Sequence, residues 1–136
     1  MIMRSLHRLP IFLILSLLPL TAFAQQWTHY TIADGLGAGR VVNICEDKEG
    51  NLWFATSSGA FWFDGRRFHH FDLSQELAGE SVADILQDRK GNFWFATNVG
   101  FWRFDGQNLR VFTTQDGLAA GDSLFDILED QYGNIW

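Results

Sequence analysis

The chain has 136 residues, 10 basic and 16 acidic side chains, a formal net charge of −6 and one cysteine. This length suits one ordinary domain, and a single cysteine excludes an internal disulfide. An acidic chain lacks the basic surface that nucleic acids and anionic membranes attract, so we expect no nucleic-acid partner. The sequence is rich in aromatic residues, with six Trp and thirteen Phe. They recur in register with the repeat described below, so we expect most of them in the core.

The first 24 residues have the three parts of a secretory signal peptide. Arg4 and Arg8 make a basic start, residues 11–20 are an apolar run, and Ala22-Phe23-Ala24 is an A-x-A cleavage site. The apolar run is shorter than the roughly 20 residues that cross a bilayer, which argues against an uncleaved anchor. No Cys follows the run, which argues against a lipoprotein. We therefore expect the mature chain to begin near Gln25, outside the cytoplasm.

One stretch of sequence recurs along the rest of the chain. G-N-L-W-F-A-T at 50–56 returns as G-N-F-W-F-A-T at 91–97 and begins again as G-N-I-W at 133–136. The spacing is 41 and then 42 residues, and an acidic turn precedes each copy. A fixed period in this range indicates a repeat architecture.

Each repeat predicts four short strands. The first, at 41–46 with copies at 82–87 and 124–129, is apolar on both faces, which suits a strand covered on both sides. A turn follows that begins with Asp and ends with Gly, and its variable middle residues are typical of a solvated turn. The other strands are expected at 52–56, 60–63 and 68–71, and in the second copy at 93–97, 101–104 and 109–112. One period earlier, residues 27–30 predict an isolated fourth strand.

Four antiparallel strands in about 41 residues are typical of a β-propeller blade, so we expect an all-β fold. The expected organisation is a signal peptide at 1–24 and a partial propeller at 25–136. The propeller part comprises an outer strand at 27–30, repeats at 41–71 and 82–112, and a truncated repeat at 124–136. Two and a half repeats cannot close a ring, which predicts an N-terminal piece of a longer protein or a truncated reading frame. Assembly of several copies into one ring is the alternative.

The repeat resembles a known family. The pattern I-x-E-D-x-x-G-N-[LFI]-W-F-A-T, then G-x-[FW]-x-F-D-G, an aromatic fourth strand and D-G-L, is similar to the two-component regulator propeller repeat. Two departures are visible: Ala55 and Ala96 stand where the family usually has Gly, and Gln75-Glu76-Leu77 replaces D-G-L.

The resemblance implies a seven-bladed propeller, commonly one of two in tandem, in the exported sensor region of a bacterial membrane protein. In that family a β-sandwich and one transmembrane helix usually lead to a cytoplasmic histidine kinase, a diguanylate cyclase or another output domain. The implied partners are an extracellular ligand such as a carbohydrate and the remaining blades of a membrane-anchored, dimeric parent. The implied location is the periplasm, with the parent in the inner membrane.

The histidines and the cysteine of the repeats fall in packing positions. His29 and His70 share a slot that Val111 fills in the next copy. His69 is adjacent to His70, so the two side chains face opposite sides of a strand and are poorly placed to share a metal. Cys45 stands where Leu fills the other copies, which predicts a small apolar residue and not a nucleophile.

A ligand site, if the chain has one, is expected at the loop end that precedes the inner strands. Arg40, Ser57, Ser58 and Asn98 are the polar residues there, and Trp62 is the aromatic candidate for stacking on a sugar ring. The alternative for each is an ordinary solvated loop residue. Glycines at 35, 37 and 39 precede a strand and no helix, so they are a weak phosphate-binding pattern.

The sequence favours an exported sensor over two alternatives, an exported polysaccharide enzyme and a protein-binding scaffold. We expect no catalytic residues, no metal ligands and no cofactor in this chain, and the pattern assigns no ligand-binding residue.

Overall fold

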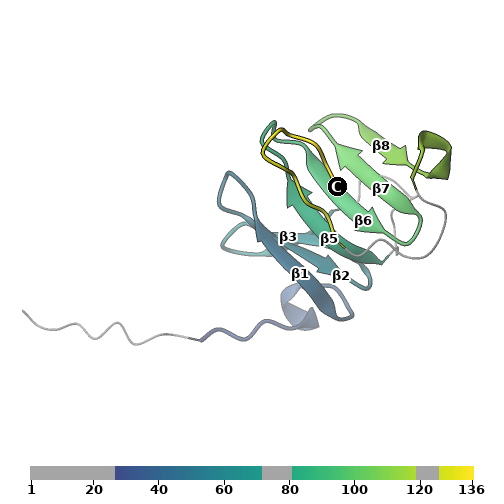
Figure 1. Ribbon diagram of the computed structural model, residues 1–136. Coiled ribbons are helices and arrows are strands. Elements are labelled where there is room, and N and C mark those ends of the chain that lie inside the picture. The colour runs from purple at the N-terminus through teal and green to yellow at the C-terminus, as the bar shows by residue number, and fades with distance from the viewer. Residues whose placement is uncertain (1–26, 72–80, 119–125) are drawn as a thin grey trace, which may run out of the picture.

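The computed structural model describes residues 27–71, 81–118 and 126–136. The expected signal peptide therefore lies outside the described residues. Two four-stranded antiparallel sheets, each ordered as in the chain, make up most of the fold (Figure 1). Blade 1 comprises β1 (Val41–Glu46), β2 (Leu52–Thr56), β3 (Gly59–Phe63) and β4 (Phe68–His70). Blade 2 comprises β5 (Val82–Gln87), β6 (Phe93–Thr97), β7 (Gly100–Phe104) and β8 (Leu109–Phe112).

The two blades repeat the same register, as the periodic sequence predicts. Trp53 pairs with Trp62 between β2 and β3, and the equivalent Trp94 pairs with Arg103 between β6 and β7. A bulge interrupts the first hairpin of each blade at the same place, beside Asn43 and beside Asp84. The predicted all-β, four-stranded blades are therefore confirmed, and no closed ring forms among the described residues.

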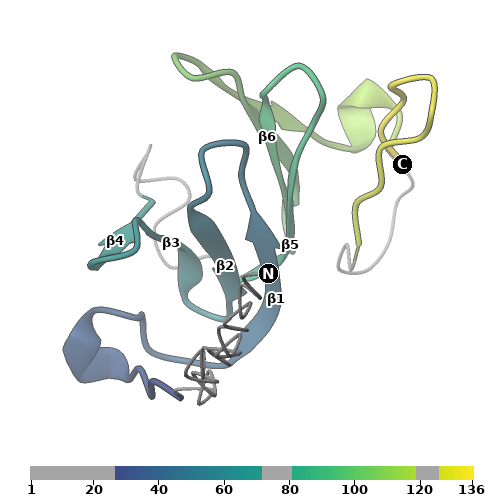
Figure 2. The same ribbon diagram turned by 90° about the vertical axis from the view of Figure 1, so that its left-hand side faces the viewer.

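The blades pack face to face, with the inner strands β1 and β5 side by side (Figure 2). Directly opposed residues of neighbouring strands point to the same face of a sheet. We call the face of each blade that carries its Trp-strand tryptophan the Trp face, and the opposite face, which carries the inner-strand isoleucine, the Ile face. The core between the blades joins the Trp face of blade 1 to the Ile face of blade 2. Its buried residues are Trp53, Ala55, Ala60, Val82, Ile85, Phe95 and Trp102.

The expectation that inner strands are covered on both faces is wrong for β1. Ile44 is 56% exposed, whereas the equivalent Ile85 and Ile127 are 3% and 6% exposed. The reason is that blade 1 covers Ile85, while none of the described residues forms a blade over Ile44.

The predicted strand at 27–30 is also not formed, because no described strand offers it a hydrogen-bonded ladder. Its position in space nevertheless follows the repeat. Tyr30 packs against Phe63 at 5.2 Å between ring centroids. The residue one period later, Phe71, packs against Phe104, the equivalent of Phe63, at 5.4 Å. Tyr30 thus occupies the place that the end of an outer strand takes on the next blade.

Two 3-10 helices, η1 (Ile32–Asp34) and η2 (Thr114–Asp116), follow residues 27–30 and β8. Each has a capping box in which a Thr side chain accepts from the backbone and an Asp side chain accepts in return. Each ends at a glycine with positive φ, 96° at Gly35 and 97° at Gly117. The conformation explains the D-G in the D-G-L pattern, since glycine adopts positive φ without strain. Neither helix, nor any other in the described ranges, has the length and hydropathy needed to span a membrane.

Residues 126–136 of the third repeat form a short hairpin. Leu128 and Trp136 exchange two backbone hydrogen bonds of 3.0 and 2.8 Å. Glu129 and Ile135 form an isolated antiparallel bridge. The hairpin lies over blade 2 in Figure 1, in yellow, and Figure 2 shows it as the start of a further blade.

Candidate functional site

The turn after each inner strand is held by one aspartate. In blade 1, Asp47 Oδ1 accepts hydrogen bonds from the backbone N–H groups of Glu49 and Asn51 at 3.0 and 2.8 Å. Its Oδ2 accepts from the Asn51 amide at 2.9 Å and from the Trp53 indole at 2.8 Å. Gly50 closes the turn at φ 85°. We call this arrangement of Asp, Gly, Asn and Trp the clasp.

The clasp recurs with the same four hydrogen bonds in all three repeats. Asp88 accepts from Lys90, twice from Asn92 and from Trp94, at 2.7–2.9 Å. Asp130 accepts from Tyr132, twice from Asn134 and from Trp136, at 2.8–2.9 Å. The recurring carboxylates thus have a structural role. Each forms the turn, as expected from sequence, and also accepts hydrogen bonds from the Asn and Trp side chains.

The clasp hydrogen bonds set the charge state of these aspartates. Burial acts to raise the pKa of Asp47 and of Asp88, but the hydrogen bonds from Trp and Asn outweigh burial and hold each pKa below its usual value. At Asp130 the hydrogen bond from the Trp136 indole is the largest influence and lowers the pKa strongly. All three carboxylates are therefore ionised acceptors at neutral pH.

The variable residue after the clasp aspartate links one repeat to the next. The Lys48 backbone N–H donates to Gln87 Oε1 at 2.8 Å, and its ammonium donates to the carbonyls of Asp88 and Arg89 at 3.0 and 2.7 Å. Arg89 repeats this role, donating its backbone N–H to Glu129 at 2.9 Å and its guanidinium to the Gln131 carbonyl at 2.9 Å. Both residues are exposed, as expected for a solvated turn, but each side chain also reaches the following turn.

Two of the polar residues expected at a ligand site, Ser57 and Ser58, use their side chains in local hydrogen bonds. The Arg40 backbone N–H donates to Ser57 Oγ at 3.1 Å, and the Ser57 N–H donates back to the Arg40 carbonyl at 3.1 Å. Ser58 Oγ lies 3.2 Å from the Thr56 hydroxyl. Asn98 occupies the turn of blade 2 that corresponds to Ser57 and is exposed. Arg40 and Ser57 are therefore brought together, but as turn partners.

Trp62, the aromatic candidate, lies in a row of stacked rings. Its ring stacks on His69 at 4.1 Å between centroids and 13° between planes, and on the other side it stacks on Trp53 at 6.2 Å. His69 Nε2 in turn lies 2.9 Å from Asp64 Oδ2. That hydrogen bond is the largest cause that lowers the pKa of Asp64. The three rings are directly opposed across β2, β3 and β4, which explains why Trp62 is half-buried.

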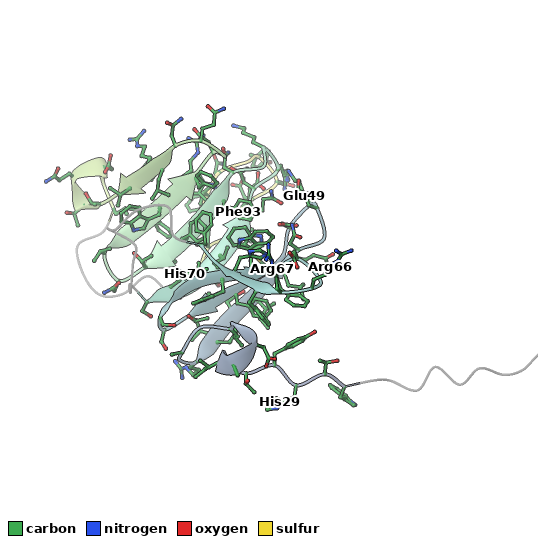
Figure 3. All side chains as sticks on the ribbon, turned by 180° about the vertical axis from the view of Figure 1, so that it is seen from behind. His29, Glu49, Arg66, Arg67, His70 and Phe93 are labelled. Atoms are coloured by element: carbon green, nitrogen blue, oxygen red, sulfur yellow. The ribbon has the colours of Figure 1, made fainter. Side chains whose placement is uncertain are left out.

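The other residues considered from sequence lie apart. His69 stacks on Trp62 and His70 packs against Phe61, so the two rings face opposite sides of the sheet. His29 lies on the N-terminal segment, away from His70 (Figure 3). Burial, followed by the nearby carboxylates of Asp84 and Asp47, raises the pKa of Cys45 to about 11, which keeps the thiol neutral. Among the described residues no three His, Cys, Asp or Glu side chains gather as a metal site.

A pocket of about 340 Å³ lies on the Trp face of blade 2. It is lined by Trp94, Phe101, Phe112, Asp116, Leu118, Ile135 and Trp136. The equivalent place on blade 1, between Trp53 and Phe71, is filled by Phe95, whose ring lies 6.1 and 5.0 Å from theirs. Ile135 is the counterpart in the third repeat of Phe93, which packs against Trp53 at 4.3 Å between ring centroids. The pocket is thus an unfilled copy of the inter-blade core.

One pair of polar residues was missed by sequence reasoning. Asp84 and Asp126 share a slot in otherwise apolar inner strands, and both accept a hydrogen bond from the backbone N–H of Ile127. The only sequence signal was an acid at the same offset in two copies, with Asn43 in the first.

Comparison with known proteins agrees with the fold. Residues 35–58 and 76–99 each match the family described as two component regulator propeller. Curated protein sequences give no match. Among solved structures, the extracellular domain of a protein assigned to a hybrid two-component system from B. thetaiotaomicron is similar, with a TM-score of 0.61 and 24% identity over 81% of this chain. The chain corresponds to 16% of the length of that structure.

Each matched segment runs from the linker before an inner strand through the clasp to the turn after the second strand. The matched segments are therefore the parts of the repeat that the clasp and the inner hairpin build. Through these two segments, the chain is similar to the two-component regulator propeller family.

Proposed function

We propose that this chain is the ligand-sensing propeller region of an exported bacterial signal-transduction protein. The observation that carries the proposal is the pair of family matches at 35–58 and 76–99. The similar solved structure is the extracellular domain of a protein assigned to such a system. At 24% identity that likeness supports the fold, so the signalling role rests on the repeat family.

The proposal includes a larger ring to which these blades belong. Three observations support it: Ile44 is exposed while its copies are buried, Tyr30 lies where an outer strand ends, and the pocket on blade 2 lacks the aromatic ring that fills its counterpart. Further blades of the full-length protein would cover these faces. Residues 27–30 would then become the outer strand of a blade whose other strands come from elsewhere in the parent.

The proposed region binds and does not catalyse. An extracellular ligand such as a carbohydrate would act by binding one arrangement of the propeller more tightly than another, since a ligand shifts an equilibrium only by its differential affinity. A membrane-anchored, dimeric parent would carry the change to a histidine kinase or diguanylate cyclase.

Export is tested by fusing residues 1–136 to alkaline phosphatase, which gains activity only outside the bacterial cytoplasm. We expect an active fusion, and an inactive one when residues 1–24 are removed. Phosphatase activity that does not depend on residues 1–24 would contradict export by the proposed signal.

Sensing is tested in the parent bacterium by deleting residues 27–112 in frame. Cells grown on single plant or host polysaccharides are then compared by transcript profiling. We expect the response to one polysaccharide class to be lost while the others persist. If every response survives the deletion, the region is not a carbohydrate sensor.

A further inference from the structure

The inner strands carry a polar slot that the repeats fill differently. Asn43 occupies it in β1, Asp84 in β5 and Asp126 in the third repeat, each directly before the inner-strand isoleucine. Asp84 is 4% exposed. A buried carboxyl group is costly unless it is hydrogen-bonded, paired with a cation or protonated. The surroundings of Asp84 therefore decide its charge.

Asp84 bridges two repeats. Its Oδ1 accepts from the N–H of Ile85 at 2.8 Å, within its own strand, and its Oδ2 accepts from the N–H of Ile127 at 2.7 Å, which is 43 residues away. Asp126 Oδ1 accepts from the same Ile127 N–H at 2.9 Å. Two carboxyl groups from neighbouring repeats thus meet at one backbone nitrogen. A single N–H cannot neutralise two full negative charges, so two ionised carboxylates would repel each other at that point.

No cationic side chain compensates the pair within the described ranges, where the ion pairs involve other residues. From β1 the Cys45 thiol is influenced by the Asp84 charge, and it is neutral because its pKa is raised to about 11. From the third repeat the facing group is Asp126. Burial, as the largest cause, together with Asp126 raises the pKa of Asp84 to about 6, against the hydrogen bonds from Ile127 and Ile85. Two carboxylates that accept from one backbone N–H repel each other, which favours a proton on the buried Asp84.

We propose that Asp84 and Asp126 form a proton-sharing latch between blade 2 and the third repeat. In the closed latch one carboxyl O–H donates to the other carboxylate, while the remaining oxygens accept from Ile85 and Ile127. Loss of that proton to water leaves two repelling carboxylates at one N–H, and the contact between the repeats loosens. Asn43, an uncharged amide, leaves the contact between blades 1 and 2 without such a switch.

The direction of the pH effect follows from linkage. The native protein holds a proton on Asp84 at pH values where the unfolded chain, with an ordinary Asp pKa of about 3.9, has lost it. The latch is therefore fully closed below about pH 4 and loosens as the pH rises through about 6. The inference goes beyond the proposed ligand sensing, because here the proton itself changes how two repeats pack.

The test uses the full chain. Carboxyl carbon NMR should give Asp84 a titration midpoint near pH 6. The protection factor of the Ile127 amide, corrected for intrinsic exchange, should fall about tenfold or more between pH 4 and pH 7. An Asp84 midpoint below about pH 5, or an Ile127 protection factor constant within about twofold, would overturn the latch.

Asp126→Asn removes one carboxyl group and keeps an acceptor oxygen. We expect the Asp84 midpoint to fall by about one pH unit or more and the Ile127 profile to become flat. The matched control is Asp105→Asn, an exposed turn residue of blade 2 that bonds the backbone of Gln107 and Asn108, and it should leave both profiles unchanged. An unchanged Asp84 midpoint in Asp126→Asn overturns the latch. If that variant does not fold, the wild-type titration and exchange profile decide alone.

Discussion

Blades 1 and 2 have nearly the same sequence pattern and strand register, yet equivalent residues differ in environment. Ile44 of blade 1 is exposed and Ile85 of blade 2 is buried. For the clasp tryptophans the first repeat is the buried one: Trp53 of blade 1 is 6% exposed, whereas Trp136 of the third repeat is 71% exposed. Each repeat thus has two unlike faces, and each face is buried only by the neighbour on that side.

The difference shows that burial here belongs to the interface and not to the blade. The Trp face of one repeat packs on the Ile face of the next, with Trp53 against Phe93 at 4.3 Å between ring centroids. Equivalent residues of two repeats can therefore be substituted and compared. The comparison separates the contribution of the inter-blade contact from that of the blade itself. The predictions below use such pairs, from the largest expected effect to the smallest.

Trp53→Ala should lower the free energy of unfolding by about 3–5 kcal/mol, because it empties the centre of the inter-blade core. Trp136→Ala removes the same residue type from the same clasp position, where none of the described residues forms a blade over it, and should cost less than about 1 kcal/mol. Urea unfolding monitored by fluorescence measures both. Equal losses would show that the clasp, and not the inter-blade contact, sets the contribution of tryptophan.

Ile85→Ala should cost about 2–4 kcal/mol, since Ile85 is buried by blade 1. Ile44→Ala, at the exposed copy of this slot, should change stability by less than about 1 kcal/mol. The same denaturation experiment applies. A large loss at Ile44 would indicate that some part of the chain outside the described ranges covers the Ile face of blade 1.

Asp88→Ala removes the acceptor of four clasp hydrogen bonds and should cost about 2–3 kcal/mol. Asp105→Ala, in the exposed turn of the same blade, should cost about 1 kcal/mol or less. Thermal melting at neutral pH compares the two variants. Similar melting temperatures would mean that the clasp contributes no more than an ordinary turn.

Acidification should weaken the clasps. The pKa values of Asp47 and Asp88 are lower in the folded protein than in the unfolded chain. Their contribution is therefore present above about pH 4 and is lost as the pH falls through the folded-state pKa. Unfolding free energies measured between pH 2 and pH 5 check this, and Asp88→Ala should show a shallower decline than wild type.

Lys48→Ala should have the smallest effect, about 0.5–1 kcal/mol, because its bonds to the next turn are partly exposed. Glu49→Ala, at the neighbouring position of the same turn, where the side chain is exposed (Figure 3), should be near neutral. If the Lys48 link between repeats contributes to stability, the urea midpoint of Lys48→Ala should lie below that of Glu49→Ala.

The hairpin pattern could be read from the sequence because it depends on neighbours in the chain. The D-x-x-G-N turn and the aromatic alternation predicted the bounds of β1, β2 and β3 to within about a residue. What lies against Trp62 could not be read in this way, because His69 reaches it through strand pairing and side-chain rotamer. The strand at 27–30 failed for a related reason: its register was right at Tyr30, but a strand also needs a partner.

The candidate site was harder to predict than the fold. The loop-end residue Ser57 is polar, and sequence alone cannot distinguish a free hydroxyl from one that accepts a hydrogen bond across a turn. Asp84 gave a weak signal because one acid in an apolar strand is equally compatible with exposure. Its importance depends on Ile127, 43 residues away, which no local pattern contains.

The clasp also has a consequence for how the chain folds. All of its bonds join residues at most six positions apart, and the copy at Asp130 is complete although Trp136 is largely exposed. Such short loops close on a timescale on the order of 10–100 ns, far ahead of contacts that span a whole repeat. Each repeat therefore contains its own nucleus, and we expect the turns to form independently before the blades stack. Folding rates should then respond to substitution at Asp47 and Asp88, while unfolding rates should respond at Ile85.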